Sequence, residues 1–171
     1  MLNETWKKLQ NGSDIRGVAM EGVEGQPVNL TPEIAKQIAC SFGAWLSERT
    51  GKLLSELTVA VGNDSRLSAG ELNGAVTQGL SMLGITVVDC GLCSTPAMFM
   101  TTVMEGYRYD GSVMLTASHL PFNRNGLKFF TKDGGLEKSD ITAILELAQE
   151  KIYTKAGKPG AIKSLDFIQV Y

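Results

Sequence analysis

This 171-residue sequence has no long apolar run, no block of like charge and too few cysteines for a disulfide framework. A membrane span needs about 20 apolar residues, and the first ten residues, MLNETWKKLQ, have no apolar run typical of a signal peptide. Three cysteines, an odd number, favour a reducing compartment. A net charge of −2 without a basic block argues against nucleic acid as a partner. We therefore expect a cytoplasmic protein that binds neither membranes nor nucleic acid.

Motifs for common cofactors and metals are also missing. Neither G-x-G-x-x-G nor a P-loop pattern occurs, and no group of residues has metal-ligand spacing. The chain has one histidine, His119, which directly follows Ser118. Apolar residues make up 43% of the chain and charged residues 20%, as is typical of a folded domain. At this length we expect one domain.

Apolar runs alternate with amphipathic segments along the chain. This alternation predicts an α/β fold in which helices cover both faces of a mainly parallel sheet. The gap between the third and fourth apolar runs is too short for a helical crossover, so these two strands are expected to be antiparallel neighbours. The expected strands are 57–62, 85–91, 111–117 and 127–131, with 14–20 as an edge strand; the expected helices are 31–49, 68–84, 96–106 and 139–152.

Local signals mark the ends of the predicted helices. Thr31 can cap the first helix, with a proline at its first position and a glycine after its end. Ser68 and Glu71 have the spacing of a capping box at the start of the second helix. Ser139 is expected to cap the last helix.

Four polar segments lie at strand ends or lead into the sheet. Ligands of open α/β sheets collect beyond the carboxyl ends of the strands. We expect the three segments that follow strands to converge on one rim of the sheet. The four are GSDIRG (12–17), GNDSRLS (62–68), CGLCSTP (90–96) and TASHLPFNRNG (116–126).

The last of these segments presents Ser118 after a strand and before an expected turn at Asn125–Gly126. A serine hydrolase needs a separate histidine and carboxylate, but the His119 ring cannot easily reach back from the next position, and the G-x-S-x-G elbow is missing. A serine that carries a phosphoryl group instead needs backbone amides, cations and a metal. Arg124 and Lys128 lie close in sequence. Taken alone, Ser118 and His119 are explained more simply by hydrogen bonds within a turn.

The other polar segments are weak signals by themselves. Asp64 and Arg66 fit an Asx turn with a surface arginine, and Arg16 equally fits a turn with an exposed arginine. Cys90 and Cys93 form a C-x-x-C resembling a redox dithiol. Because the first continues a strand and the second precedes a helix cap, two small buried thiols are favoured.

Taken together, the segments resemble the first domain of the α-D-phosphohexomutases, the phosphoglucomutase and phosphomannomutase family. The resemblance rests on SDIRG, GNDSRLS, GLCSTP and TASHLPFNRNGLK, in the family's order and spacing, and covers nearly the whole chain. TASH combined with NG-x-K is its most specific part. It implies a three-layer α/β/α sandwich with a mixed, mostly parallel sheet over residues 1–156. Residues 157–171 would be a linker or the start of a second domain.

The resemblance also implies an activity. The serine of the TASH loop, Ser118, would carry a phosphoryl group in the resting enzyme and donate it to a hexose monophosphate. The bisphosphorylated sugar would then reorient and return a phosphoryl group from its other position, which interconverts hexose 1-phosphate and hexose 6-phosphate. The phosphate on Ser118 would be one ligand of Mg²⁺, and a hexose bisphosphate would be the activator.

Further site residues follow from the same resemblance. Lys128 matches the proposed general acid/base, and His119 is a second candidate for proton handling. Arg16 matches the arginine of the DIRG loop that faces the active site and binds phosphate. Supporting roles in substrate or phosphate binding are implied for Asn125, Asp64 and Arg66.

Two departures from the family pattern leave the substrate open. Leu120 replaces the asparagine usual after TASH, and Arg124 stands where a tyrosine is often found. The sequence does not distinguish glucose, mannose and glucosamine as the sugar.

The sequence also lacks the family's metal loop D-G-D-x-D-R, its sugar-selecting loop and its distal phosphate-binding domain. We expect one domain of a longer enzyme, inactive alone, with Mg²⁺ bound mostly by the remaining domains of that parent enzyme. One alternative is a non-catalytic phosphosugar-binding or interaction module of the same fold. The other is a thiol-disulfide protein that uses Cys90 and Cys93.

Overall fold

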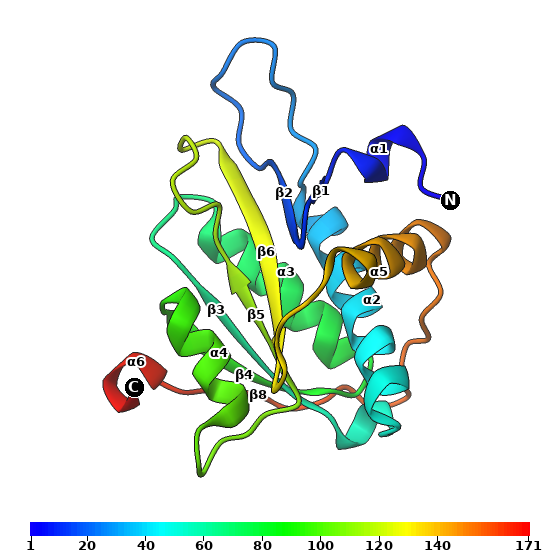
Figure 1. The fold of residues 1–171 in the computed structure, drawn as a ribbon, viewed down its shortest axis with the longest axis vertical. Coiled ribbons are helices and arrows are strands. Elements are labelled where there is room, and N and C mark those ends of the chain that lie inside the picture. The colour runs from blue at the N-terminus through cyan, green and yellow to red at the C-terminus, as the bar shows by residue number, and fades with distance from the viewer.

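One twisted, eight-stranded sheet organises the computed structural model, which describes residues 1–171 (Figure 1). Its main path runs in the order β1-β2-β6-β5-β3-β4-β8, and β7 pairs with β6. The strands are β1 Gln10–Asn11, β2 Asp14–Val18, β3 Thr58–Asn63, β4 Thr86–Leu92, β5 Gly111–Leu115, β6 Arg124–Thr131, β7 Gly134–Gly135 and β8 Ile162–Ser164. The helices are α1 Glu4–Lys7, α2 Pro32–Thr50, the 3₁₀ turn η1 Leu54–Glu56, α3 Ala69–Met82, α4 Thr95–Val103, α5 Lys138–Glu150 and α6 Phe167–Val170.

The sheet is mixed, as predicted. β3 pairs in parallel with β4 and β5, and β4 pairs in parallel with β8. β6 is antiparallel to both β5 and β2, which confirms the expected pairing across the short connection. The expected edge strand at residues 14–20 is present as the shorter β2, Asp14–Val18, which pairs with β6 on one side and is flanked on the other side only at Asp14 and Ile15. The two-residue β1 covers the other side of β2.

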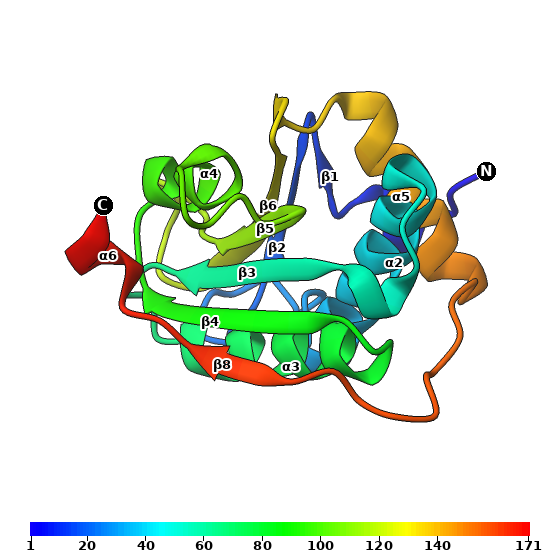
Figure 2. The same cartoon turned by 90° about the horizontal axis from the view of Figure 1, so that it is seen from below.

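Helices cover both faces of the sheet, which confirms the three-layer α/β/α architecture (Figure 2). Because alternate residues of a strand point to opposite faces, Val59 and Val61 pack in the larger core with α2, α3 and α5. Ala60 packs in the smaller core with Ala97 and Met98 of α4. None of the helices combines the length and apolar character that crossing a membrane requires.

Helix α2 has the predicted local signals at both ends. The Thr31 hydroxyl accepts a hydrogen bond from the Ile34 N–H at 3.1 Å, and Gly51 ends α2 with a φ of 73°. The cap of α5 differs from the prediction. Glu137 is its N-cap residue and donates its N–H to the Asp140 carboxylate at 2.9 Å, so Ser139 lies inside the first turn.

Residues 157–171 are packed against the sheet. β8 extends the sheet beside β4. Phe167 of α6 is fully buried in the smaller core and lies edge-on to Tyr107. That this segment leads into a second domain stays a prediction.

Candidate functional site

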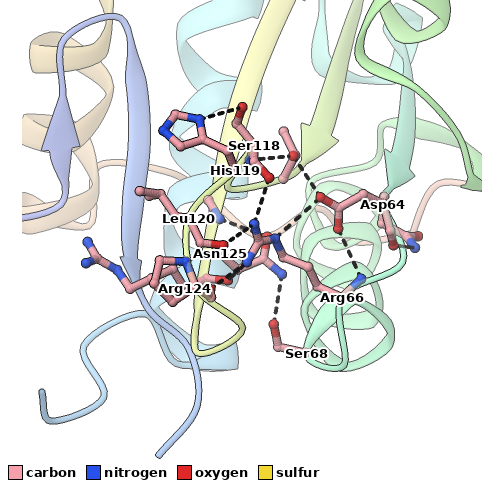
Figure 3. A network of polar contacts seen from close by, with 12 residues as sticks. Asp64, Arg66, Ser68, Ser118, His119, Leu120, Arg124 and Asn125 are labelled. Carbon is pink, nitrogen blue, oxygen red and sulfur yellow. Dashed lines mark hydrogen bonds and ion pairs between the residues drawn. The ribbon is translucent and has the colours of Figure 1, made fainter. Parts of the chain in front are cut away.

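The polar segments after β3 and β5 meet at one rim of the sheet, as expected (Figure 3). Asp64, which follows β3, donates its N–H to the Leu115 carbonyl at the end of β5 at 3.1 Å. Cys93, after β4, donates its N–H to the Asn63 carbonyl at 2.9 Å. β6 runs in the opposite direction and therefore begins at this rim with Arg124. Parallel pairing thus brings together loops that are far apart in the sequence.

Ser118 lies exposed on this rim in a strained backbone conformation. Its φ is 55°, in the left-handed region, which costs a residue other than glycine about 1–2 kcal/mol. The Ser118 N–H donates to the Thr116 hydroxyl at 2.9 Å, and that hydroxyl donates to the Asp64 carboxylate at 2.8 Å. This chain of contacts runs from the end of β3 to the serine, and it holds the serine in the strained conformation.

Arg66 binds the backbone of the Ser118 loop from the other side. Its guanidinium donates to the carbonyls of Ser118 and Leu120 at 2.8 Å each, of Pro121 at 2.7 Å and of Arg124 at 3.1 Å. The Arg66 side chain is 12% exposed. Figure 3 shows the Ser118 hydroxyl pointing away from this guanidinium. The four carbonyl oxygens therefore point toward Arg66 rather than toward the serine hydroxyl. The positive charge of Arg66 lies on the side of the loop opposite that hydroxyl.

A second polar cluster lies on β2 and β6. The Lys128 ammonium is 3.0 Å from one oxygen of the Asp14 carboxylate, and the Arg16 guanidinium is 3.5 Å from the other. The side chains of Arg16, Asp14 and Lys128 are 19%, 16% and 30% exposed. Lys128 pairs with Met114 in β5, which lies four residues before Ser118. Both predicted cations therefore stand on strands that lead to the serine rim.

His119 is exposed beside the serine. Its Nδ1 lies 3.4 Å from the Ser118 hydroxyl, so the expectation that the ring cannot reach back is wrong. This distance is long for a hydrogen bond. No carboxylate hydrogen-bonds the ring, so a hydrolase triad is incomplete.

Asn125 departs from the predicted turn. Asn125 and Gly126 form no turn but lie in β6, where they pair with Gly17 and Arg16. The Asn125 side chain is fully buried, donates to the Ser68 hydroxyl at 2.8 Å and accepts from the Gly126 N–H at 2.9 Å. Its amide is therefore engaged inside the protein, and a contact between Asn125 and a phosphate stays a prediction. Ser68 makes no capping hydrogen bond at the start of α3, so the predicted capping box is wrong.

The three cysteines are free and buried. Burial raises the pKa of Cys90 to about 12, and it also raises the pKa of Cys93. Reactive dithiols need accessible cysteines of lowered pKa. The geometry therefore favours the prediction of two buried structural thiols over a redox pair.

No three side chains of histidine, cysteine, aspartate or glutamate cluster with metal-ligand geometry. The carboxylate nearest to Ser118 in the contact chain, that of Asp64, is already bound to Thr116 and to Arg66 at 3.5 Å.

A pocket with a volume of about 680 Å³ lies away from the serine rim. Its lining includes Asp110, which precedes β5, whereas Ser118 follows β5. We place the candidate site at the rim because the strained serine, the Arg66 guanidinium and the Asp64 carboxylate meet there.

Residues 7–155 match the family described as phosphoglucomutase/phosphomannomutase, alpha/beta/alpha domain I. The chain belongs to this family. It is 40% identical over 115 residues to a phosphoglucosamine mutase from Nautilia profundicola. The match covers 67% of this chain and 24% of that protein. It is 33% identical over 167 residues to a phosphoglucomutase/phosphomannomutase from Thermococcus kodakarensis. That match covers 96% of this chain and 34% of the relative.

A solved structure shows the same fold. A phosphoglucomutase/phosphomannomutase family protein from Burkholderia thailandensis superposes with a TM-score of 0.77 and 25% identity, over 100% of this chain and 35% of that one. This phosphohexomutase domain I thus spans about a quarter to a third of the length of the relatives it matches.

Two residues of the rim were missed by sequence reasoning. Thr116, directly after β5, links the Asp64 carboxylate to the Ser118 N–H through its hydroxyl, and Asp14 is the shared partner of Arg16 and Lys128. Both stand inside quoted motifs, TASH and SDIRG. Thr116 binds Asp64 and Asp14 binds Lys128, and both of these partners are distant in sequence. Only the pairing of strands brings them together.

Proposed function

We propose that this chain is the phosphoserine-bearing domain of a phosphohexomutase that interconverts hexose 1-phosphate and hexose 6-phosphate through a bisphosphorylated sugar. The observation that carries the proposal is the exposed, strained Ser118, with its loop carbonyls bound by Arg66 behind it. A phosphoserine has a charge of roughly −1.5 to −2. Carbonyl oxygens facing it would repel it, and the Arg66 contacts remove that repulsion.

In the proposed transfer, the phosphorus–oxygen bond to Ser118 breaks as a bond from phosphorus to a sugar hydroxyl oxygen forms. The proton of that hydroxyl passes to Lys128 in its neutral amine form, and the ammonium so formed returns a proton to the serine oxygen. His119, at 3.4 Å from that oxygen, is the second candidate for this return. Arg16 would bind the phosphate of the sugar. Transfer in the opposite direction reloads the serine from the other end of the bisphosphorylated sugar.

Mg²⁺ would take the phosphate on Ser118 as one ligand and balance its charge. The other ligands would come from further domains, and we propose that the chain alone does not turn over as a mutase. The shares of the relatives' lengths that the chain covers support this division of the enzyme.

Intact mass measurement tests the proposal. The proposed parent enzyme, which contains this chain, is incubated with a hexose 1,6-bisphosphate and Mg²⁺, and we expect the mass to rise by one phosphoryl group. Ser118→Ala should gain none, whereas Ser139→Ala, which removes an exposed hydroxyl on α5, should behave as the wild type. Equal phosphorylation of Ser118→Ala would refute the assignment. Binding of hexose phosphate by wild type without any phosphorylation would instead support a non-catalytic phosphosugar-binding module.

A further inference from the structure

The carboxylate of Asp14 lies between the two cations to which the proposed function gives chemical roles. It is 3.0 Å from the Lys128 ammonium and 3.5 Å from the Arg16 guanidinium. Each cation contacts a different carboxylate oxygen. One carboxylate therefore fixes both side chains at once.

The pairing of β2 with β6 places these groups on one face of the sheet. Ile15 pairs with Leu127 and Arg16 with Gly126, so the same register continued by one residue sets Asp14 opposite Lys128. Directly opposed residues of antiparallel strands have neighbouring side chains. On the other side of β2, Asp14 pairs with Asn11 in the tight β1–β2 hairpin, which fixes the backbone of Asp14.

Gly126 leaves room for the arginine of this cluster. A Cβ on Gly126 would collide with the backbone oxygens of Ile15 and Thr116 and would lie 3.0 Å from the Arg16 Cγ. The Arg16 side chain therefore passes close over β6 at a residue that has no side chain. Lys128, two residues further along β6, lies on the same face, with its ammonium 5.8 Å from the centre of the Phe130 ring.

Stability alone does not account for this arrangement. Ion pairs with partly exposed partners contribute about 0–1 kcal/mol, and the lysine here is 30% exposed. Two neighbouring cations also repel each other. A carboxylate between them lowers that repulsion and restricts two long side chains whose free rotation would cost up to about 2 kcal/mol each on ligand binding.

From this geometry we infer that Asp14 is a positioning residue that holds Lys128 and Arg16 ready for the phosphorylated sugar. The inference rests on the proposed function, because the roles of the two cations come from it. Asp14 touches neither the serine nor, in this arrangement, the transferred phosphoryl group. Its contribution is to orient the proton-handling lysine and the phosphate-binding arginine before substrate arrives.

Side-chain nitrogen relaxation by NMR tests the inference without any reaction. Asp14→Asn keeps the shape of the residue and removes its charge, and we expect the Lys128 Nζ and Arg16 Nε groups both to become more mobile. Asp14→Glu should restore part of the order. Asp133→Asn, an exposed carboxylate in the turn before β7, is the matched control and should change neither group. Unchanged order of both cations in Asp14→Asn overturns the inference.

A second measurement separates positioning from folding. Titration with inorganic phosphate should show equal or tighter binding by Asp14→Asn, because a negative charge beside the cations is lost. The rate of phosphoryl transfer from hexose 1,6-bisphosphate to Ser118 should fall, on the order of tenfold to a hundredfold, as small misplacements of reacting groups cost this much. A purely structural role would lower binding and transfer together. If wild type itself accepts no phosphoryl group, the proposed function fails, while the relaxation result still decides the role of Asp14.

Discussion

Replacing Arg66 tests how the Ser118 loop is held. Arg66→Met keeps much of the side-chain length and removes every donor. Four hydrogen bonds to the carbonyls of Ser118, Leu120, Pro121 and Arg124 disappear, of which those to Leu120 and Arg124 are partly buried. Hydrogen bonds that involve a charged group contribute about 1.5–3 kcal/mol each, and released carbonyls on the surface recover water. Counting only the two partly buried bonds, we expect a loss of about 3–6 kcal/mol.

The loss can appear as local opening or as global unfolding, so two assays are needed. Amide hydrogen exchange reports the loop through the N–H groups of Leu120 and Arg124, which bond to Ala117 and Pro121 at 3.1 and 3.0 Å. A local loss of this size raises their exchange by at least about tenfold. Urea denaturation reports the global free energy of unfolding.

Arg49→Met is the matched control for Arg66→Met. Arg49 is 55% exposed and has one ion pair, to Asp140 at 3.4 Å, so its removal should cost about 1 kcal/mol or less. Arg66→Lys should lie between wild type and Arg66→Met, because an ammonium cannot match the fork of a guanidinium. If Arg66→Met changed neither loop exchange nor the urea midpoint, the reasoning about this loop would be refuted.

Two further predictions concern stability. Gly126→Ala should destabilise the chain by about 3 kcal/mol or more, because backbone oxygens of Ile15 and Thr116 lie where the added Cβ would be. Gly74→Ala on α3, where a Cβ would meet open space, should stabilise the chain by about 1 kcal/mol. Equal urea midpoints for the two variants would contradict the prediction for Gly126. Burial raises the pKa of Cys40 to about 11 and that of Cys90 to about 12, from 9.0. The unfolded chain therefore ionises its thiols first as the pH rises past 9.0, and the free energy of unfolding should fall above that pH. Cys90→Ala should reduce this fall in the free energy of unfolding. Urea denaturation of wild type and Cys90→Ala below and above pH 9.0 measures the fall in each protein. An equal fall in both would rule out the Cys90 thiol as its cause.

Local sequence signals were sufficient for the boundaries of α2 and for the existence of β3, β4 and β5. A cap, a proline and a terminal glycine act within one turn of the chain, so α2 begins and ends where they predict. Ser68 shows where such signals fail. It directly precedes α3, but Asn125, 57 residues away, donates to its hydroxyl, which makes no capping hydrogen bond. The buried Asn125 amide needs a partner, and a distant residue of this kind cannot be read from the local sequence.

The same limit of local signals explains Asn125 and Gly126, which have the sequence of a tight turn. β2 offers these residues a row of backbone partners, and they extend β6 to Arg124 as a result. Sequence alone has no measure of how much pairing a distant strand provides, so the turn was expected where the strand continues.

The sequence by itself determined the α/β class, the antiparallel return from β5 to β6 and the motif residues Ser118, His119, Arg16 and Lys128. Only the tertiary structure decided which side chains hold them. Arg66 reaches four carbonyls of a loop more than 50 residues away, and Asp14 meets Lys128 across 114 residues. The periodicity of a chain reports which face a residue occupies. Which residues share that face depends on the order and register of strands, and these are set by packing across the whole sheet.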